Sequence, residues 1–302
     1  MQEKISHIFL RSLIGIIKLA QIIPLQFLYF MSDISGTILC KIASNYTKRM
    51  KSNLLKVFPD LSNKDVVALS RKVYANLYDF TYEIVKCSSF SEKEFISRCR
   101  IVNKDEITEV LRTNKRIICY SGHFVNYEWL VSFPLHMPNI LMGNLYYSAN
   151  SNPLIEWLIS TRNRFGAITI PHNQPIKPIL SMFEAIKQGK YDGVIIGTLA
   201  DVPPYRRKDR SIHKSPFLKQ FLSVYSGSER IGRKYNMTFM YAHIRRAERG
   251  YYSIEFKRLT PDDVDTNPYA YTDDFVRHLE QNIKEQPDLW MLWSNKRLKI
   301  TN

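Results

Sequence analysis

Cysteine is scarce in this 302-residue chain, and its few copies follow no pattern. Cys40, Cys87, Cys99 and Cys119 form no C-x-x-C pair and no spacing typical of a metal site. We therefore expect reduced, mostly buried thiols in a cytoplasmic compartment rather than a disulfide framework. The sequence also lacks H-E-x-x-H and any cluster of Cys and His, so we expect no metal centre and no bound cofactor.

Several other motifs that would define a function class are missing. There is no G-x-S-x-G around a serine, so a covalent acyl-enzyme is not expected. There is also no glycine-rich phosphate-cradling loop, no internal repeat, no low-complexity tract and no recognised nucleic-acid-binding motif. These absences disfavour nucleotide chemistry and nucleic acid as a partner.

Acidic residues are too few to balance the basic ones. Forty-three Lys and Arg face 28 Asp and Glu, which gives a formal charge of +15 and an isoelectric point near 9.6. A surface this basic favours an anionic partner, and the general candidates are nucleic acid and a membrane with acidic headgroups. With no nucleic-acid motif present, we expect the anionic membrane surface.

A long hydrophobic run is missing as well, although residues 9–31 are largely apolar. The longest charge-free stretch, residues 19–32, is interrupted by Pro24 and is short of the roughly 20 residues that cross a bilayer. Lys4, Arg11 and Lys18 recur at the same heptad position, which predicts one cationic stripe on an apolar helix lying in the membrane interface. The alternative is an ordinary helix packed on the protein. We divide the chain into an interfacial helix, 1–35, and an α/β domain, 36–302.

Two further basic stretches have alternative interpretations. Residues 45–56 (NYTKRMKSNLLK) contain no acidic side chain, and either add attraction to anionic headgroups or form a solvated helix face. Residues 205–219 contain six Lys and Arg against Asp209, and either form a loop on headgroup phosphates or a disordered surface segment.

Short apolar runs and helical patterns alternate after residue 115. The expected strands are 116–120, 140–147, 167–170, 193–199, 237–246 and 251–259, and the expected helices between them are 153–164 and 175–188. Ser62 with Asp65, and Ser91 with Glu94, are capping signals for two earlier helices. Alternation predicts an α/β fold with a largely parallel central sheet flanked by helices. A hairpin at residues 248–250 makes the sheet mixed.

The sequence KRIICYSGHFVNYEWL, residues 115–130, carries the strongest chemical signal. His123 and Glu128 are five residues apart, so they can meet only if His123 lies on a strand-to-helix turn and Glu128 on the first helical turn. A carboxylate that holds a histidine is typical of a general base, with Asn126 beside them as a donor and acceptor. The alternative is an unrelated histidine and a solvated carboxylate. Gly122 would supply the backbone freedom for the turn.

Three other stretches are expected near the same edge of the sheet, where strands end. Arg164 is preferred over Arg162 for holding a phosphate, because the two cannot point the same way on a helix. Asp201 follows a strand and could bind an acceptor hydroxyl or cap its loop. Ser226 and Gly227 form a polar turn before a helix whose N-terminus could face an anion or oxyanion.

Taken together, these blocks resemble the bacterial lipid A biosynthesis acyltransferase family, within the wider group of lysophospholipid acyltransferases. Residues 122–128, GHFVNYE, are similar to the family's G-H-x-G-N-x-E form of the histidine-x4-acid motif. The order of the other blocks also matches: Asn53-Leu54 and Phe58-Pro59 precede the motif, and 164–166, Asp201, Ser226-Gly227 and the tryptophan-rich 289–293 follow it. Val125 stands where the family commonly has Gly, and Val202 where it has Gln.

The resemblance implies transfer of a fatty acyl group from a thioester, acyl carrier protein or coenzyme A, to a hydroxyl of a membrane lipid. The first expected acceptor is a lipid A precursor; a lysophospholipid or an amino-acid-containing lipid is the alternative. It implies a peripheral or monotopic protein on the cytoplasmic face of the bacterial inner membrane. The competing classes are a membrane-associated hydrolase that uses the same dyad to activate water, and a noncatalytic protein that binds membranes or nucleic acid. Acyl carrier proteins are acidic, so the positive charge also suits that donor.

Overall fold

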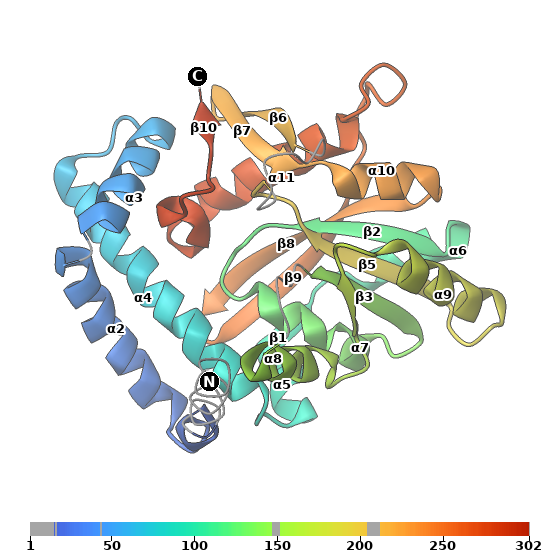
Figure 1. Cartoon of the computed structure of the whole chain (residues 1–302), viewed down its shortest axis with the longest axis horizontal. Coiled ribbons are helices and arrows are strands. Elements are labelled where there is room, and N and C mark those ends of the chain that lie inside the picture. The colour runs from blue at the N-terminus through green and yellow to red at the C-terminus, as the bar shows by residue number, and fades with distance from the viewer. Residues whose placement is uncertain (1–14, 16, 43, 147–151, 204–211, 302) are drawn as a thin grey trace, which may run out of the picture.

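The computed structural model describes residues 1–302 except 1–14, 16, 43, 147–151, 204–211 and 302. It is an α/β fold with a curled, largely parallel central sheet flanked by helices, as the alternating pattern predicted (Figure 1). The α-helices are α2 (Leu25–Ile42), α3 (Ser44–Val57), α4 (Asn63–Cys87), α5 (Glu92–Arg98), α6 (Lys104–Thr113), α7 (Phe133–His136), α8 (Pro153–Asn163), α9 (Ile176–Lys187), α10 (Gly227–Lys234) and α11 (Ala270–Glu285).

The central sheet has seven strands in the order β1-β9-β8-β2-β5-β3-β4. These are β1 (Cys99–Ile101), β2 (Arg116–Ser121), β3 (Ile140–Tyr146), β4 (Ile168–Pro171), β5 (Gly193–Leu199), β8 (Thr238–Glu248) and β9 (Tyr251–Arg258). The β8–β9 hairpin is antiparallel, and the other neighbouring pairs are parallel. Ile117, Ile118, Val194 and Ile196 are fully buried, because β2 and β5 lie in the middle of the sheet and are covered on both faces.

The register of β2 and β5 decides where the site forms. The two strands are parallel neighbours, and Ser121 lies opposite Leu199. His123 and Asp201 each follow their strand by two residues. Because parallel strands end at the same edge of a sheet, these two residues leave the sheet side by side.

Local sequence signals correctly placed several elements. Ser62 accepts a hydrogen bond from the Asp65 amide, and Ser91 accepts one from the Glu94 amide, so both predicted caps are confirmed. The hairpin turn at Gly250 is also confirmed, and its φ of 82° lies in the left-handed region that glycine adopts readily.

Two elements differ from the expectation. The segment after His123 is a 3₁₀ helix, η1 (Tyr127–Ser132), that leads into the single turn of α7, not a continuous α-helix. Residues 212–217, expected to belong to a basic loop, form strand β6 (Ile212–Phe217), which joins β7 (Gln220–Tyr225) and β10 (Ile300–Thr301) in a second sheet. The more basic part of that expected loop, 204–211, lies outside the described residues.

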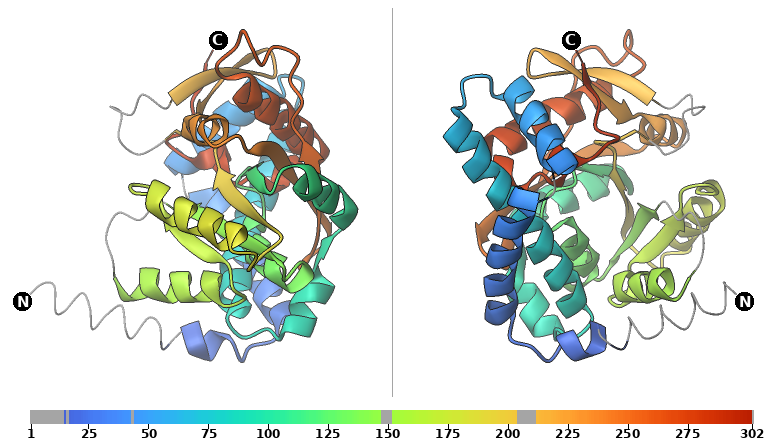
Figure 2. Two further views of the ribbon diagram at one scale, coloured as in Figure 1. Left: turned by 90° about the vertical axis from the view of Figure 1, so that its right-hand side faces the viewer. Right: turned by 60° about the vertical axis from the view of Figure 1, so that its left-hand side comes forward.

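The amino-terminal part of the described chain forms a separate helical layer. Helix α2 runs through the expected boundary at residue 35 and lies beside α4 along one side of the molecule (Figures 1 and 2). Its other face carries exposed Phe27, Phe30, Ile34 and Ile38 at helical spacing. No helix among the described residues is long and apolar enough to cross a membrane. Lys4 and Arg11 of the expected cationic stripe lie outside the described residues.

Helix α3 contains the basic stretch 45–56 and contacts the carboxyl-terminal segment. The Arg49 guanidinium donates to the carbonyl of Ser294, and the Lys56 ammonium donates to that of Ile300. Asn53 donates its amide to the carbonyl of Trp293. Part of the basic stretch therefore has a structural role inside the protein.

Glu83 of α4 connects this helical layer to the sheet and is fully buried. Its carboxylate accepts hydrogen bonds from Tyr29 of α2, Tyr252 of β9 and Asn126 next to the motif. Burial raises the pKa of Glu83 from 4.5 to about 7, although these three donors act in the opposite direction.

This raised pKa predicts a pH-dependent stability. As the pH rises from 4.5 to about 7, the unfolded chain releases the Glu83 proton before the folded chain does, so the free energy of unfolding falls. The loss is about 3 kcal/mol at about 1.4 kcal/mol per pH unit, complete above pH 7. Urea titrations at several pH values should show this fall in the free energy of unfolding for wild type but not for Glu83→Gln, because a glutamine side chain does not titrate. If the free energies of unfolding of the two proteins differed by the same amount at every pH in that range, the expectation would be contradicted.

Candidate active site

The site is built on the loop that follows β2, with His123 as its accessible titratable group. The His123 side chain keeps 20 % of its surface exposed, whereas Gly122 is buried beneath it. A Cβ atom on Gly122 would come within 2.6 Å of Leu279 and 3.2 Å of the Asp201 carboxylate. Gly122 does not adopt a positive φ. The glycine is therefore needed for close approach rather than for the backbone freedom that the sequence suggested.

Asp201, not Glu128, holds the imidazole. His123 Nδ1 lies 2.5 Å from Asp201 Oδ1, and the His123 amide donates to Asp201 Oδ2 at 2.7 Å. The indole of Trp290 donates to the same Oδ2 at 2.8 Å. Burial alone would raise the pKa of Asp201, but the charge of His123 and the hydrogen bonds from His123 and Trp290 hold it below its ordinary value. An ionised Asp201 keeps the proton on Nδ1 and leaves the lone pair on Nε2.

Glu128 forms a different pair. Both of its carboxylate oxygens accept from Arg162 of α8, one from Nε at 2.8 Å and the other from Nη2. Arg162 also lies over the ring of Tyr146 at 4.5 Å. The prediction that Glu128 orients His123 is therefore wrong for this structure. The 3₁₀ turn carries Glu128 toward α8, where the guanidinium fork fits a carboxylate in bidentate geometry.

Asn126 supports the loop from below and is buried. Its side-chain oxygen accepts from the Glu128 amide, and its Nδ2 donates to Glu83. The amides of Phe124, Val125 and Tyr127 are also engaged with carbonyls of the protein. The peptide bond between Val125 and Asn126 is cis. Asn126 thus positions the loop. The neighbouring amides form hydrogen bonds within the protein rather than with a substrate.

The tryptophan-rich segment near the carboxyl terminus holds the same loop from another side. Phe124 and Trp290 form an isolated antiparallel bridge, in which the Met291 amide donates to the His123 carbonyl at 3.0 Å and the Val125 amide to Leu289. Trp290 is fully buried, so its indole N–H fixes Asp201 without access to water. This segment is part of the site although it is more than 160 residues away in the chain.

Ser226 and Gly227 lie close to the end of β5, as expected for residues near the same edge. The Tyr225 amide donates to the Ala200 carbonyl at 2.8 Å, and the hydroxyls of Thr198 and Ser228 are 2.9 Å apart. A Cβ on Gly227 would come within 2.1 Å of the Tyr225 hydroxyl, so a larger residue there would have to displace the Tyr225 ring. The N-terminus of α10 therefore begins beside the residue that precedes Asp201.

Arg164 binds a backbone carbonyl rather than Glu128. Its Nη1 donates to the Cys87 carbonyl at 2.9 Å, at the end of α4, and its guanidinium lies against the ring of Phe165. Arg162, not the Arg164 that was preferred from the sequence, is the arginine beside the loop. Successive residues on a helix point about 100° apart, so position along the chain alone did not reveal which one faces Glu128.

Three contacts of the site were not predicted from the sequence: Asp201 with His123, Arg162 with Glu128, and Trp290 with Asp201. Neither Trp290 nor Arg162 was given a role, and Asp201 was expected at the same edge of the sheet as His123 but as a ligand of an acceptor hydroxyl or a loop cap rather than as the partner of His123. One signal was available for Asp201, because it follows a neighbouring parallel strand at the same distance as His123 does. No comparable signal exists for Trp290, whose contact with Asp201 depends on the path of the carboxyl-terminal segment.

The geometry supports proton abstraction by a partly exposed imidazole that a buried carboxylate orients. Among the described residues, no group of three or more His, Cys, Asp or Glu is arranged to hold a metal ion. A search of curated proteins found no match. The family model described as bacterial lipid A biosynthesis acyltransferase matches residues 4–300, nearly the whole chain, including every residue of the site. The protein therefore belongs to the bacterial lipid A biosynthesis acyltransferase family.

Proposed function

We propose that this protein transfers a fatty acyl group from a thioester to a hydroxyl of a membrane lipid, with a lipid A precursor as acceptor. Family membership supports the reaction class. The single observation that carries the mechanism is the contact of 2.5 Å between His123 Nδ1 and the buried Asp201 carboxylate. The contact holds a proton on Nδ1, so that the lone pair on Nε2 can accept a proton from the substrate.

In the proposed reaction, Nε2 of His123 removes the proton from the acceptor hydroxyl as its oxygen attacks the thioester carbonyl. The tetrahedral oxyanion then collapses, the carbon–sulfur bond breaks, and the proton on His123 passes to the leaving thiolate. The products are the lipid ester and the free thiol of the donor. Asp201 stabilises the imidazolium that exists between these two proton transfers. Base assistance of this kind contributes about 10²- to 10⁴-fold to the rate.

The oxyanion needs donors, and we place them at the N-terminus of α10 rather than at the loop after His123. The amides around Asn126 are already hydrogen-bonded within the protein. The turn at Ser226 and Gly227 is tied to β5 next to Asp201 and opens an eight-residue helix. The Glu229 amide donates to the Ser226 carbonyl, so the proposed donors are the amides of Gly227 and Ser228, which the helix dipole supports. The Glu128–Arg162 pair has a positioning role, because it ties η1 to α8.

The proposed location is the cytoplasmic face of the bacterial inner membrane, with peripheral or monotopic attachment. The exposed apolar face of α2 supports this proposal, because Phe27 and Phe30 are more than half exposed and align with Ile34 and Ile38. The formal charge of +15 is suited to anionic headgroups and also to an acidic acyl carrier protein as donor. The donor is either that carrier protein or coenzyme A.

Lipid analysis tests the proposed function directly. Mass spectrometry of total lipids from bacteria with and without the gene should reveal one lipid A species that lacks an acyl chain in the absence of the gene. A change confined to lysophospholipids or amino-acid-containing lipids would replace the acceptor and keep the reaction. With purified protein, thioester consumption that continues unchanged when the acceptor is omitted would identify a hydrolase instead.

A further inference from the structure

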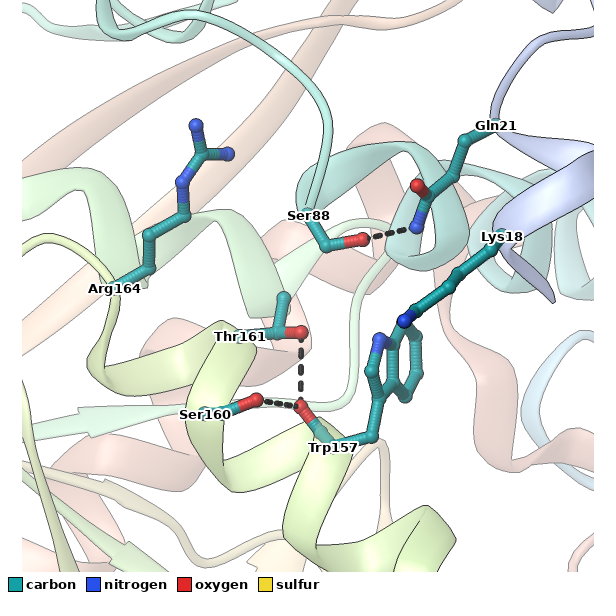
Figure 3. A pocket seen from close by; sticks show the side chains of 7 residues that line it. All are labelled: Lys18, Gln21, Ser88, Trp157, Ser160, Thr161 and Arg164. Carbon is teal, nitrogen blue, oxygen red and sulfur yellow. Dashed lines mark hydrogen bonds between the residues drawn. The ribbon is translucent and has the colours of Figure 1, made fainter. Parts of the chain in front are cut away.

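A pocket of about 400 Å³ lies between the amino-terminal segment and α8, and His123 is not among its lining residues (Figure 3). Its walls come from three parts of the chain: the residues before α2, the end of α4, and α8 with the residue after it. The lining side chains are Lys18, Gln21, Ser88, Trp157, Ser160, Thr161 and Arg164. This volume is within the range of about 300 to 1,000 Å³ that is usual for sites of small ligands.

The charges in this pocket are of one sign. Lys18 and Arg164 enter it from opposite walls, and no lining residue is acidic (Figure 3). Two carboxylates on neighbouring elements are already paired, Glu94 with Arg98 and Glu128 with Arg162. A cationic pocket with no carboxylate among its lining residues favours an anion as ligand.

Hydrogen bonding shows which groups of the pocket can bind that anion. The hydroxyls of Ser160 and Thr161 both donate to the carbonyl of Trp157, so their protons are used within α8. Arg164 uses Nη1 for the Cys87 carbonyl, but a guanidinium has five N–H donors, and the ammonium of Lys18 has three. Gln21 donates to Ser88, whose own hydroxyl donates to the Val85 carbonyl. Lys18 and Arg164 are therefore the charged groups of the pocket with several donors for phosphate oxygens.

The surface beside the pocket indicates where the anion comes from. Leu19 and Ile22, next to Lys18 and Gln21, are 67 % and 79 % exposed, and α2 continues with the exposed apolar face that starts at Phe27. Trp157 is half-buried in the pocket wall, whereas Trp129, Trp290 and Trp293 are fully buried in the core. Apolar side chains around a cationic site, with a tryptophan at the boundary, are typical of a surface that meets lipid headgroups.

We propose that this pocket binds the headgroup phosphate of an anionic phospholipid and holds the amino-terminal segment and α8 at the membrane surface. The site is separate from the His123–Asp201 pair, and its ligand is a lipid of the surrounding bilayer rather than the lipid that is acylated. It also connects the membrane to the reaction, because α8 carries Arg162, which binds Glu128. The sequence predicted that Arg164 holds a phosphate, and in this proposal that phosphate belongs to a bilayer lipid.

Vesicle binding by the full-length protein tests the site. We expect tighter binding to phosphatidylglycerol vesicles than to phosphatidylcholine vesicles, and a loss of about fivefold for each of Lys18→Gln and Arg164→Gln, from about 1 kcal/mol per charge. The double variant should lose about 20- to 30-fold, and Arg164→Lys should retain most of the affinity. Lys190→Gln, which removes an exposed cation after α9, is the matched control and should change binding less than twofold.

Trp157 gives a second readout that a general loss of positive charge would not change in the same way. Vesicles of brominated phosphatidylglycerol should quench its fluorescence, and the quenching should disappear in Trp157→Phe and fall in the double variant. Equal losses for Lys190→Gln and Arg164→Gln, or equal quenching in wild type and the double variant, would overturn the proposal. If soluble glycerol phosphate abolishes the quenching at micromolar concentration, the site is one for a soluble phosphate instead. The proposal does not depend on acyl transfer, since His123→Ala should bind vesicles like wild type.

Discussion

Replacing His123 by Ala is expected to lower the rate of acyl transfer by about 10²- to 10⁴-fold, because no other base takes its place. The imidazole is partly exposed, whereas Asp201 is fully buried behind it. Release of the donor thiol in the presence of acceptor lipid measures the effect. The change should be in kcat rather than in the KM for the lipid, because the proton is transferred only in the reaction.

His123→Asn is the matched control for this prediction. Its side-chain N–H can occupy the place of Nδ1 and donate to Asp201, so the buried carboxylate keeps a partner and the fold is preserved. Because Asn has no basic nitrogen, the variant should be as inactive as His123→Ala while unfolding at the wild-type urea concentration. Substantial transfer by either variant would mean that another group removes the proton.

Asp201→Asn is expected to lower the rate of acyl transfer by a similar factor, about 10²- to 10⁴-fold, because it changes the tautomer of His123. Two donors, the His123 amide and the Trp290 indole, face Oδ2, whereas His123 Nδ1 alone faces Oδ1. The carboxamide oxygen should therefore occupy the place of Oδ2, and the NH₂ group should face Nδ1. Nδ1 must then accept, so the proton moves to Nε2 and the base is blocked.

The ¹⁵N chemical shifts of the His123 ring report this tautomer directly. In the neutral ring, wild type should carry the proton on Nδ1, and Asp201→Asn should carry it on Nε2. Glu128→Gln is the matched carboxylate-to-amide control and should leave the wild-type tautomer unchanged, because Glu128 faces Arg162. If Glu128→Gln changes the tautomer and Asp201→Asn does not, the pairing first inferred from the sequence would be correct after all.

Much of the fold was predictable because its signals are local. The caps at Ser62 and Ser91, the hairpin at Gly250 and the apolar runs of the central strands each depend on a few neighbouring residues. The short edge strand β1 and helix α6 were not predicted, because β1 has three residues and α6 follows it closely. Strand β6 was hidden in a basic segment, because its hydrogen bonds come from its one neighbour in the described sheet, β7, which lies between β6 and β10.

The site was harder to predict than the fold. Sequence spacing favoured Glu128 as the partner of His123, since both lie in one motif, but nearness along the chain did not decide where each side chain points. The pairing with Asp201 follows from the parallel register of β2 and β5, which joins residues 78 positions apart. The choice between Arg162 and Arg164 likewise depended on how α8 packs against the loop.

The sequence by itself determined the α/β class, the central strands, the identity of the candidate base and the family, because hydrophobic period, capping residues and motif order are properties of the chain. The tertiary structure decided which carboxylate serves that base, which arginine binds the other carboxylate, and which tryptophan fixes Asp201. These pairings are contacts between residues far apart in the chain, and they are set by strand register and helix packing. A buried charge must find a partner where the fold places one, whatever its nearest neighbours in the sequence are.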